Sequence, residues 1–311
     1  MFGRQATPAE VAFVAELVQR GLPLVEAPDS IWASIERGMG TPRVVSAPRV
    51  VPRWALAMAA TLVLAASSFV WWQANRVQPW EVVRLDTGGG RIKIGDYLET
   101  DNRSRAAIKI GEIGTVELEP NTRLALLFAG PHEHRLTLAR GMISAEIVAP
   151  PRVFFVETPA STVVDLGCAY TMQVDETGVG MLRVTSGWAS LEWDKRESLV
   201  PAGASCPTRP ELGPGTPAFD DATERLRQAL YAFDFENGGT GAVEVVLSEA
   251  RDRDTLTLWH LLSRVDGDLR ARVFDRMVAL TPLPAGVARD RALALDAATL
   301  KLWREELAWT W

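Results

Sequence analysis

The sequence predicts a multidomain protein with four parts: a short α-helical head, one transmembrane helix, an all-β domain that is a sandwich or a short solenoid, and an α-helical C-terminal domain. Three observations predict this order. A run of 19 residues without charge spans Trp54 to Trp72, many short runs that alternate apolar and polar residues follow it, and near residue 219 the apolar period changes from 2 to 3.6. At 311 residues, the chain is long enough for two domains.

The composition excludes several classes of protein. A net charge of −6 and a pI near 5.3 argue against nucleic-acid binding, which calls for a basic surface. With two Cys, the chain is not a disulfide-dense scaffold and cannot hold a zinc ion with four thiolates of its own. Tryptophan, at 11 residues, outnumbers Phe at 10 and Tyr at 3. This excess favours surfaces that contact a membrane or a protein.

Residues 1–53 are expected to form a helical head and a Pro-rich connection to the membrane. Two short helical patterns occur, and in the second Ile31, Trp32 and Ile35 line one face. Two helices of this size bury too little surface to be stable alone. The head is therefore either a helix pair that docks on a cytoplasmic partner through that face, or a frayed arm beside the membrane.

Residues 54–72 are expected to be the membrane span. At about 1.5 Å per residue they reach roughly 28 Å, close to the roughly 30 Å of a bilayer core. Trp54 begins the run and Trp71 and Trp72 end it, as interfacial belts do. A buried core helix is the alternative, whereas a cleaved signal peptide would be shorter and nearer the start of the chain. Arginines flank both ends, so the bias toward a cytoplasmic N-terminus is weak.

Beyond the span we expect a β domain at 81–206, a linker at 207–219 and a helical domain at 220–311. Turn residues punctuate the β runs at roughly 8–12-residue intervals, as in sandwiches and barrels. The linker is inferred from its Pro and Gly content. Four or five helices follow, one of them beginning at Asp296. Trp303, Trp309 and Trp311 near the C-terminus form either a partner surface or the closing face of their own bundle.

The residues that carry chemistry are sparse, so no catalytic function and no cofactor are expected. The chain has three His and none of the common nucleophile, phosphate-loop or metalloprotease motifs. His132 and His134 could share a face and hold a metal, but a solvated hairpin loop is favoured. His260 lies on an apolar helical face, where a core or interface histidine is expected.

Cys168 and Cys206 are expected to form a disulfide if the β domain lies in an oxidising compartment. The bond would close a loop of about 38 residues and stabilise the fold by roughly 3–4 kcal/mol. The alternative is two separate small apolar residues. The distance between the two Cα atoms decides between these possibilities, and sequence does not give it.

A longer pattern runs through "IKIGDYLETDNRSRAAIKIGEIGTVELEPNTRLAL", followed by "LTLARGMISAEI", "VFFVETPASTVVDLGCAYTMQV" and "LRVTSGWASLEW". In these stretches the β region resembles the FecR-type domain of membrane-bound sigma-factor regulators. The matching positions of the first two stretches are Gly95, Asp96, Leu98, Thr100, Ser104, Ala106, Gly114, Val116, Leu118, Pro120, Thr122, Leu124 and Gly141.

The resemblance implies a single-pass regulator of the bacterial inner membrane, with its N-terminus cytoplasmic and its C-terminus periplasmic. It implies a head that binds a sigma factor and a β domain that senses or relays a signal from an envelope protein. Three features depart from the family: Gly167-Cys168-Ala169-Tyr170 stands where relatives have a G-T-x-F element, the head is short, and the tail is helical.

An anti-sigma factor is therefore the leading hypothesis for function. The alternative is an envelope-anchored scaffold without a transcriptional role, whose partner surface would be Trp303, Trp309 and Trp311. A polysaccharide-binding protein is a third, less favoured hypothesis.

Overall fold

The computed structural model describes residues 67–68, 80–84 and 90–311, and all of these fall within the unit Ala65–Trp311. The predicted head, with Ile31, Trp32 and Ile35, lies outside the described residues. So does the predicted span Trp54–Trp72, apart from Ser67 and Ser68. Within the described part of the chain, every helix is too short or too polar to cross a membrane.

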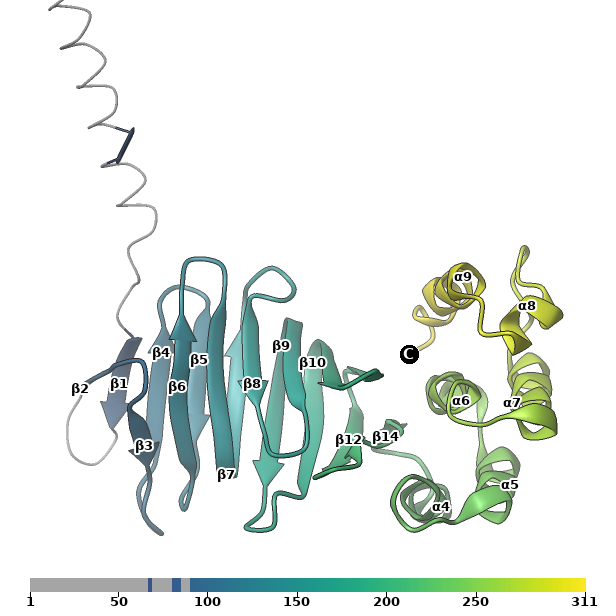
Figure 1. Ribbon diagram of the computed structural model, residues 1–311, viewed down its shortest axis with the longest axis horizontal. Coiled ribbons are helices and arrows are strands. Elements are labelled where there is room, and N and C mark those ends of the chain that lie inside the picture. Colours follow the sequence, from purple (N-terminus) through teal and green to yellow (C-terminus); the bar gives the residue numbers. More distant parts are fainter. Residues whose placement is uncertain (1–66, 69–79, 85–89) are drawn as a thin grey trace, which may run out of the picture. The chain divides into compact units, whose positions relative to one another are not determined.

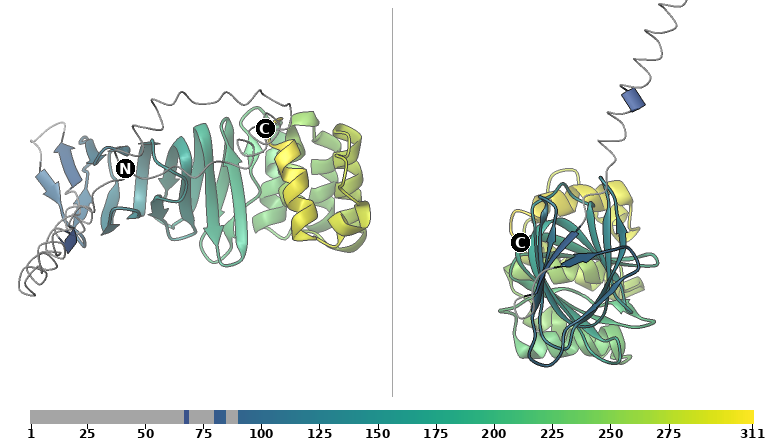
Figure 2. Two further views of the ribbon diagram at one scale, coloured as in Figure 1. Left: turned by 90° about the horizontal axis from the view of Figure 1, so that it is seen from above. Right: turned by 90° about the vertical axis from the view of Figure 1, so that its left-hand side faces the viewer.

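A large β-sheet domain followed by helices makes up the described part, as predicted (Figure 1). The strands follow one another along the domain in near-sequence order, blue to green in Figures 1 and 2. They are β1 Trp80–Arg84, β2 Gly90–Ile92, β3 Tyr97–Glu99, β4 Ala106–Ile110, β5 Gly114–Leu118, β6 Arg123–Ala129, β7 His134–Ile147, β8 Phe154–Glu157, β9 Thr162–Val174, β10 Gly180–Trp193, β11 Arg196–Pro201, β12 Ala204–Arg209, β13 Gly213–Pro214 and β14 Ala218–Phe219.

Strand pairing divides the domain into two layers. One layer has the order β3-β6-β7-β8-β9-β10-β11, and the other has the order β2-β1-β4-β5-β7-β9-β10-β12. The long strands β7, β9 and β10 belong to both layers, because one half of each pairs in the first layer and the other half in the second. Apolar side chains from both layers fill one core that includes Leu124, Leu138, Ile108 and Tyr170.

Residues 207–219 are not the predicted linker. They contain the end of β12 and the short strands β13 and β14, and residues 213–219 are all buried. The Gly215 N–H donates to the Pro207 carbonyl, and the hydroxyl of Ser198 donates to the Gly215 carbonyl. Proline and glycine fit here because this stretch runs along a sheet edge, where few ladder hydrogen bonds are required of it.

The helical part has six α-helices among the described residues, where sequence predicted four or five. They are α4 Glu224–Phe235, α5 Gly239–Glu249, α6 Thr255–Leu262, α7 Gly267–Leu280, α8 Arg289–Leu293 and α9 Ala297–Leu307, with a 3-10 turn at Asp252–Asp254. Asp296 caps α9 as expected, since its carboxylate accepts from the Thr299 N–H at 2.9 Å. These helices bury a second core that includes Leu226, Val246, Phe274 and Trp303.

Candidate functional site

The helical part packs on the end of the β domain through a junction with three kinds of contact. A buried ion pair lies at its centre, a histidine covers a strand edge, and a cluster of tryptophans contacts the β10–β11 hairpin. Partners and ligands often bind where two structural units meet, so the junction is a candidate functional site.

The ion pair joins Arg264, which follows α6, to Asp234 of α4, with 2.9 Å between Nη1 and Oδ1. Both side chains are almost fully buried. Asp234 also accepts from the N–H of Thr216, and Arg264 donates to the Ser198 hydroxyl of β11 at 2.7 Å. The buried charges are thus paired and hydrogen-bonded, as burial in a low-dielectric interior requires.

His260 of α6 covers the edge of strand β11. Its Nε2 lies 3.3 Å from the backbone nitrogen of Leu199 and 3.2 Å from the carbonyl oxygen of the same residue, so the tautomer decides which of the two it bonds. Burial, reinforced by the charges of Arg264 and Arg304, lowers the pKa of His260 to about 3. The ring is therefore neutral at physiological pH and serves as an interface histidine, one of the two predicted alternatives.

Three tryptophans meet on the other side of this contact. The ring of Trp311 lies 6.2 Å from that of Trp188 in β10 and 6.1 Å from that of Trp259 in α6. Its indole N–H donates to the Thr255 hydroxyl at 3.0 Å. Trp311 therefore helps to hold the two parts together. A cavity of about 430 Å³ lies beside this cluster. Its lining includes Trp188 and Leu199 of the hairpin, Arg304 of α9, and Pro151 and Leu166 of the β domain.

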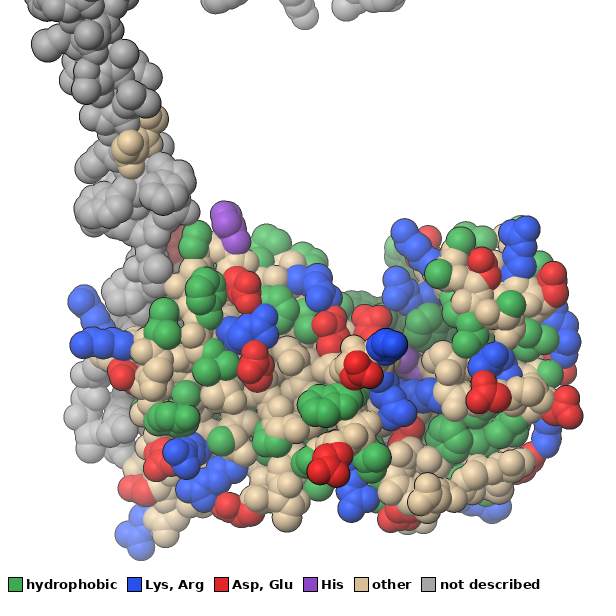
Figure 3. Space-filling view, viewed as in Figure 1, with side chains coloured by type: hydrophobic (Ala, Val, Ile, Leu, Met, Phe, Trp, Pro, Cys, Tyr) green, Lys and Arg blue, Asp and Glu red, His purple; other side chains and the backbone are tan. Residues whose placement is uncertain are grey.

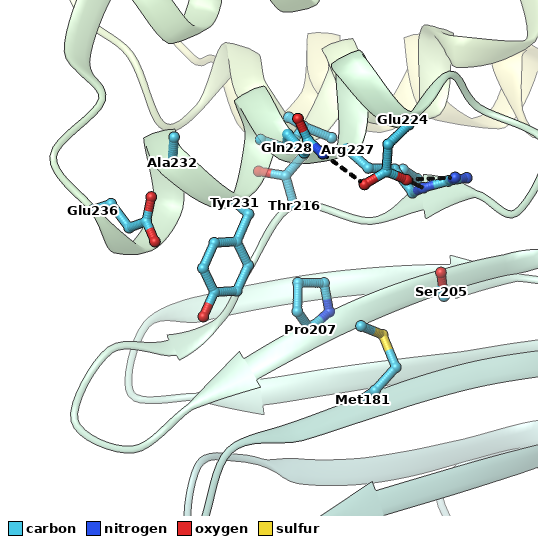
Figure 4. Close-up of a pocket in the computed structure, with 12 residues that line it drawn as sticks. Met181, Ser205, Pro207, Thr216, Glu224, Arg227, Gln228, Tyr231, Ala232 and Glu236 are labelled. Atoms are coloured by element: carbon cyan, nitrogen blue, oxygen red, sulfur yellow. Dashed lines mark hydrogen bonds and ion pairs between the residues drawn. The ribbon is translucent and has the colours of Figure 1, made fainter.

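A larger cavity, about 610 Å³, lies between helix α4 and the outward face of strands β10 and β12 (Figure 4). Met181 and Pro207 rise from the sheet, and the ring of Tyr231 reaches down from α4 toward them. The polar side chains of Ser205, on the sheet, and Gln228, on α4, line the same cavity (Figure 4). The volume falls within the roughly 300–1,000 Å³ typical of ligand sites. We call this cavity the α4 groove.

A hydrogen-bonded trio fixes one end of the α4 groove. Glu224 accepts from Arg227 at 2.9 Å and from the Gln228 amide at 3.0 Å, and both bonds lower the pKa of the Glu224 carboxyl. Arg227 also donates to the carbonyls of Asp220 and Ala222. Since all three side chains stand on the first turns of α4, the helix positions them.

The predicted disulfide is wrong, because Cys168 and Cys206 are both free and buried. Cys168 lies opposite Gly187, and Cys206 lies opposite Leu182, whose other neighbour is Met172. The two cysteines are thus two strands apart and about 13 Å apart along the strands, too far for a bond.

Each thiol has its own hydrogen-bond acceptor. Cys168 donates to the buried carboxylate of Asp165 at 2.8 Å, and Cys206 donates to the Gly215 carbonyl at 3.1 Å. Burial raises the pKa of both thiols, that of Cys206 to about 12, and also raises the pKa of Asp165. Both sulfur atoms are therefore protonated and packed in the core, where their reactivity is low.

The three predicted C-terminal tryptophans do not form one surface. Trp303 is 1% exposed and packs edge-to-face on Phe274, so it cannot be part of a partner surface. Trp311 is at the junction, and Trp309 is 90% exposed. The helical repeat places Trp303 on the inner face of α9 while Trp309 follows the end of that helix.

No group of three or more His, Cys, Asp and Glu side chains in the described part of the chain is arranged to hold a metal ion. His132 is exposed in the turn before β7, and His134 begins that strand. On the face drawn in Figure 3, acidic and basic side chains are interspersed instead of being gathered by sign. That face therefore offers no basic surface of the kind that nucleic acids bind.

Gly95 is the first of the FecR-like sequence positions, and the structure explains why a glycine stands there. Gly95, with φ of 90°, donates to the Leu126 carbonyl, and the Leu126 N–H donates to the Asp96 carbonyl. Asp96 also closes a turn onto Lys93 through its backbone N–H and its carboxylate. Gly95 is thus the third residue of a tight turn and also the first residue of a glycine bulge that leads into β3.

Two threonines and another glycine of the pattern meet where β3, β6 and β7 come together. The Thr100 hydroxyl donates to the Glu119 carbonyl and accepts from the Thr122 N–H. The Thr122 hydroxyl in turn bonds both backbone groups of Met142. A Cβ on the neighbouring Gly141 would collide with Thr122. The pattern thus encodes bulges, close approaches and buried hydrogen bonds, not reactive groups.

A model of a known protein family matches the part of the chain that contains these glycines and threonines. The family described as FecR protein matches residues 96–188. This region is similar to a FecR domain. It lies inside the 81–206 interval predicted from sequence and covers 93 of the 311 residues. The match ends within β10, so it does not include β11, β12 or the helices α4 to α9.

Solved structures show a weaker similarity. Two crystal structures of a candidate anti-sigma factor from Parabacteroides distasonis ATCC 8503 share 14% and 13% sequence identity with the chain, with TM-scores of 0.36 and 0.35. Each match covers 43% of this chain and 63%, less than two thirds, of that protein. No curated protein matches the chain.

The α4 groove was not found from the sequence. Its floor comes from β10 and β12 and its wall from α4, and only the fold brings them together. The one available signal was Tyr231, one of three tyrosines, on a helix that also carries Glu224, Arg227 and Gln228 toward the groove.

Proposed function

We propose that the protein is a single-pass regulator of a sigma factor, with its N-terminus in the cytoplasm and its FecR and helical parts in the periplasm of a bacterium. In this proposal the FecR domain relays an envelope signal across the membrane, and residues 1–53 bind the sigma factor. The match of residues 96–188 to the FecR family carries the proposal.

Two features of the sequence support the proposed topology. The uncharged run Trp54–Trp72 precedes the FecR domain and is long enough to span a bilayer. Ahead of it lie two amphipathic patterns of the kind that dock on a partner. The FecR assignment also favours a regulatory role over an enzymatic one.

Pull-down of the host's own sigma factors with the 311-residue chain tests this proposal. We expect one sigma factor to be retained, and retention to fall at least tenfold in the Trp32→Arg variant, because a charge would interrupt the apolar face shared with Ile31 and Ile35. Ser46→Arg, in the Pro-rich connection, is the control. Failure of the intact chain to retain any sigma factor would overturn the proposal.

A scaffold without a transcriptional role is the second candidate function, and the exposed ring of Trp309 favours it. Deleting residues 1–45 separates the two candidates. A sigma-factor regulator loses its effect on transcription in that variant, whereas a scaffold retains its phenotype and instead loses it in Trp309→Ala.

A further inference from the structure

His260 closes the contact between helix α6 and the edge of strand β11. The ring is 2% exposed, and its Nε2 lies 3.3 Å from the backbone nitrogen and 3.2 Å from the carbonyl oxygen of Leu199. Among the described strands, β11 pairs with β10 alone. The ring therefore occupies the place that a further strand would take, and its departure would expose the backbone groups of Leu199.

The surroundings of the ring oppose its protonation. Burial, reinforced by the positive charges of Arg264 and Arg304, lowers the pKa of His260 to about 3. Three carboxylates belong to the same neighbourhood: Asp234, which is paired with Arg264, and Glu197 and Glu305, which line the adjoining cavity. Because a charged imidazole is stable in water but not in this contact, the ring takes up a proton readily only after it has left Leu199.

The cavity of about 430 Å³ provides room for that movement. Its lining includes Leu199, which the ring contacts, and Arg304, whose charge acts on the ring. Water that enters from this cavity therefore reaches the α6–β11 contact first. The middle strands β7 and β9 pair with neighbours on both sides, so an opening at β11 leaves their hydrogen bonds intact.

We propose that His260 is a proton-operated latch between the helical part and the β domain. When the ring takes up a proton it leaves Leu199, and the α6–β11 contact opens locally while the middle of the sheet stays folded. Acidification thus uncovers the edge of β11. The latch is built from described residues alone and would stand even if residues 1–53 bound no sigma factor.

Hydrogen–deuterium exchange of the Leu199 amide in the 311-residue chain tests the latch. A released ring titrates near 6.5 and the latched ring near 3, so the equilibrium constant for opening should rise roughly thirtyfold from pH 8 to pH 5, after correction for the intrinsic exchange rate. The amide of Ile143, in β7 between β5 and β9, reports global unfolding.

We expect Leu199 to open at least about tenfold more often than Ile143 and with a weaker dependence on urea, since a local opening exposes less surface. Equal opening constants and equal urea dependence at the two amides would mean that only global unfolding frees the ring, and would overturn the proposal. So would an opening constant at Leu199 that is the same at pH 8 and pH 5.

Two variants assign the effect to the latch. His260→Gln does not titrate, and the change at Leu199 between the two pH values should fall below about threefold. Arg304→Met keeps the ring but removes one of the charges that oppose its protonation, so the change should become smaller. Circular dichroism confirms that each variant is folded.

His134→Gln is the matched control, because burial also lowers the pKa of that histidine, which lies at the start of β7. The pH dependence of the Leu199 opening should be unaltered in this variant. The same pH dependence in His260→Gln and His134→Gln would refute the latch.

Discussion

At the scale of single residues, three glycines allow three strands to serve both layers of the β domain. Gly141, Gly167 and Gly187 have φ of 97°, 90° and 71°, and each lies between the two halves of its long strand. Residues with a Cβ rarely adopt such angles. The pairing register of β9 with β10 shifts on both sides of Gly187, where the strands change layer.

Gly187→Ala should therefore be strongly destabilising. The alanine would carry an unfavourable φ, and its Cβ would collide with the carbonyl oxygen of Gly167. We expect the free energy of unfolding to fall by more than about 2 kcal/mol. Urea unfolding followed by circular dichroism measures this.

Gly241→Ala is the matched control. Gly241 lies in helix α5, and a Cβ there would meet no atom within 4 Å. The substitution should raise stability by up to about 1 kcal/mol through helix propensity. Similar losses in the two variants would contradict the collision at Gly187.

At the scale of elements, helix α6 covers the edge of strand β11 that pairs with no other strand. An uncovered strand edge presents free N–H and C=O groups to other chains. His260 satisfies one of these groups at Leu199, and the ring is buried in the process. The neutral imidazole suits this position because Arg264 and Arg304 oppose a second proton.

The stability of the protein should consequently depend on pH through His260. Its folded pKa of about 3 is below the unfolded value of about 6.5, so the unfolded state binds more protons between these values. The contribution of His260 to the free energy of unfolding is therefore fully present above about pH 7. It is lost as the pH falls toward 3, by at most about 1.4 kcal/mol per pH unit.

His260→Gln keeps a donor and an acceptor near Leu199 but does not titrate. We expect the difference in unfolding free energy between pH 8 and pH 5.5 to shrink in this variant by about 1.4 kcal/mol. His132→Gln, at an exposed histidine, should leave that difference unchanged. An unaltered pH dependence in His260→Gln would refute the role of the buried ring.

At the scale of the whole described region, the junction makes the β domain and the helices depend on each other. Arg264 and Asp234 lie in the helical part, whereas Ser198 lies in β11 and Thr216 lies between β13 and β14. Trp311, at the C-terminal end, also joins the two parts, because its ring packs near that of Trp188 in β10. Through these contacts, unfolding of one part removes the partners of buried groups in the other.

Arg264→Met should break this coupling, since it leaves the Asp234 carboxylate buried without its counter-ion. We expect a loss of about 3–5 kcal/mol and a separate, earlier melting transition of the helices in calorimetry. Adding Asp234→Asn should recover much of the loss, because the amide still accepts from the Thr216 N–H.

The control is Arg272→Met, which removes an exposed ion pair with Glu244 and should cost less than about 1 kcal/mol. A single melting transition in Arg264→Met, at the temperature of the unaltered protein, would contradict the proposed coupling.

Local patterns were sufficient for much of this fold. Alternating apolar residues predicted the strands of 81–206, and the 3.6-residue period together with Asp296 predicted the helices, because both depend on neighbours in sequence. The FecR pattern was also readable, since its glycines and threonines occupy bulges and close approaches that tolerate few other residues.

Only the tertiary structure decided what those elements do together. It separates Cys168 from Cys206 by strand register, buries Trp303, and turns the supposed linker at 207–219 into part of a sheet. It also assembles the α4 groove from β10, β12 and α4. The reason is physical: distances between strands, and the burial of a side chain, depend on residues far away in sequence, whereas period and capping depend on residues nearby.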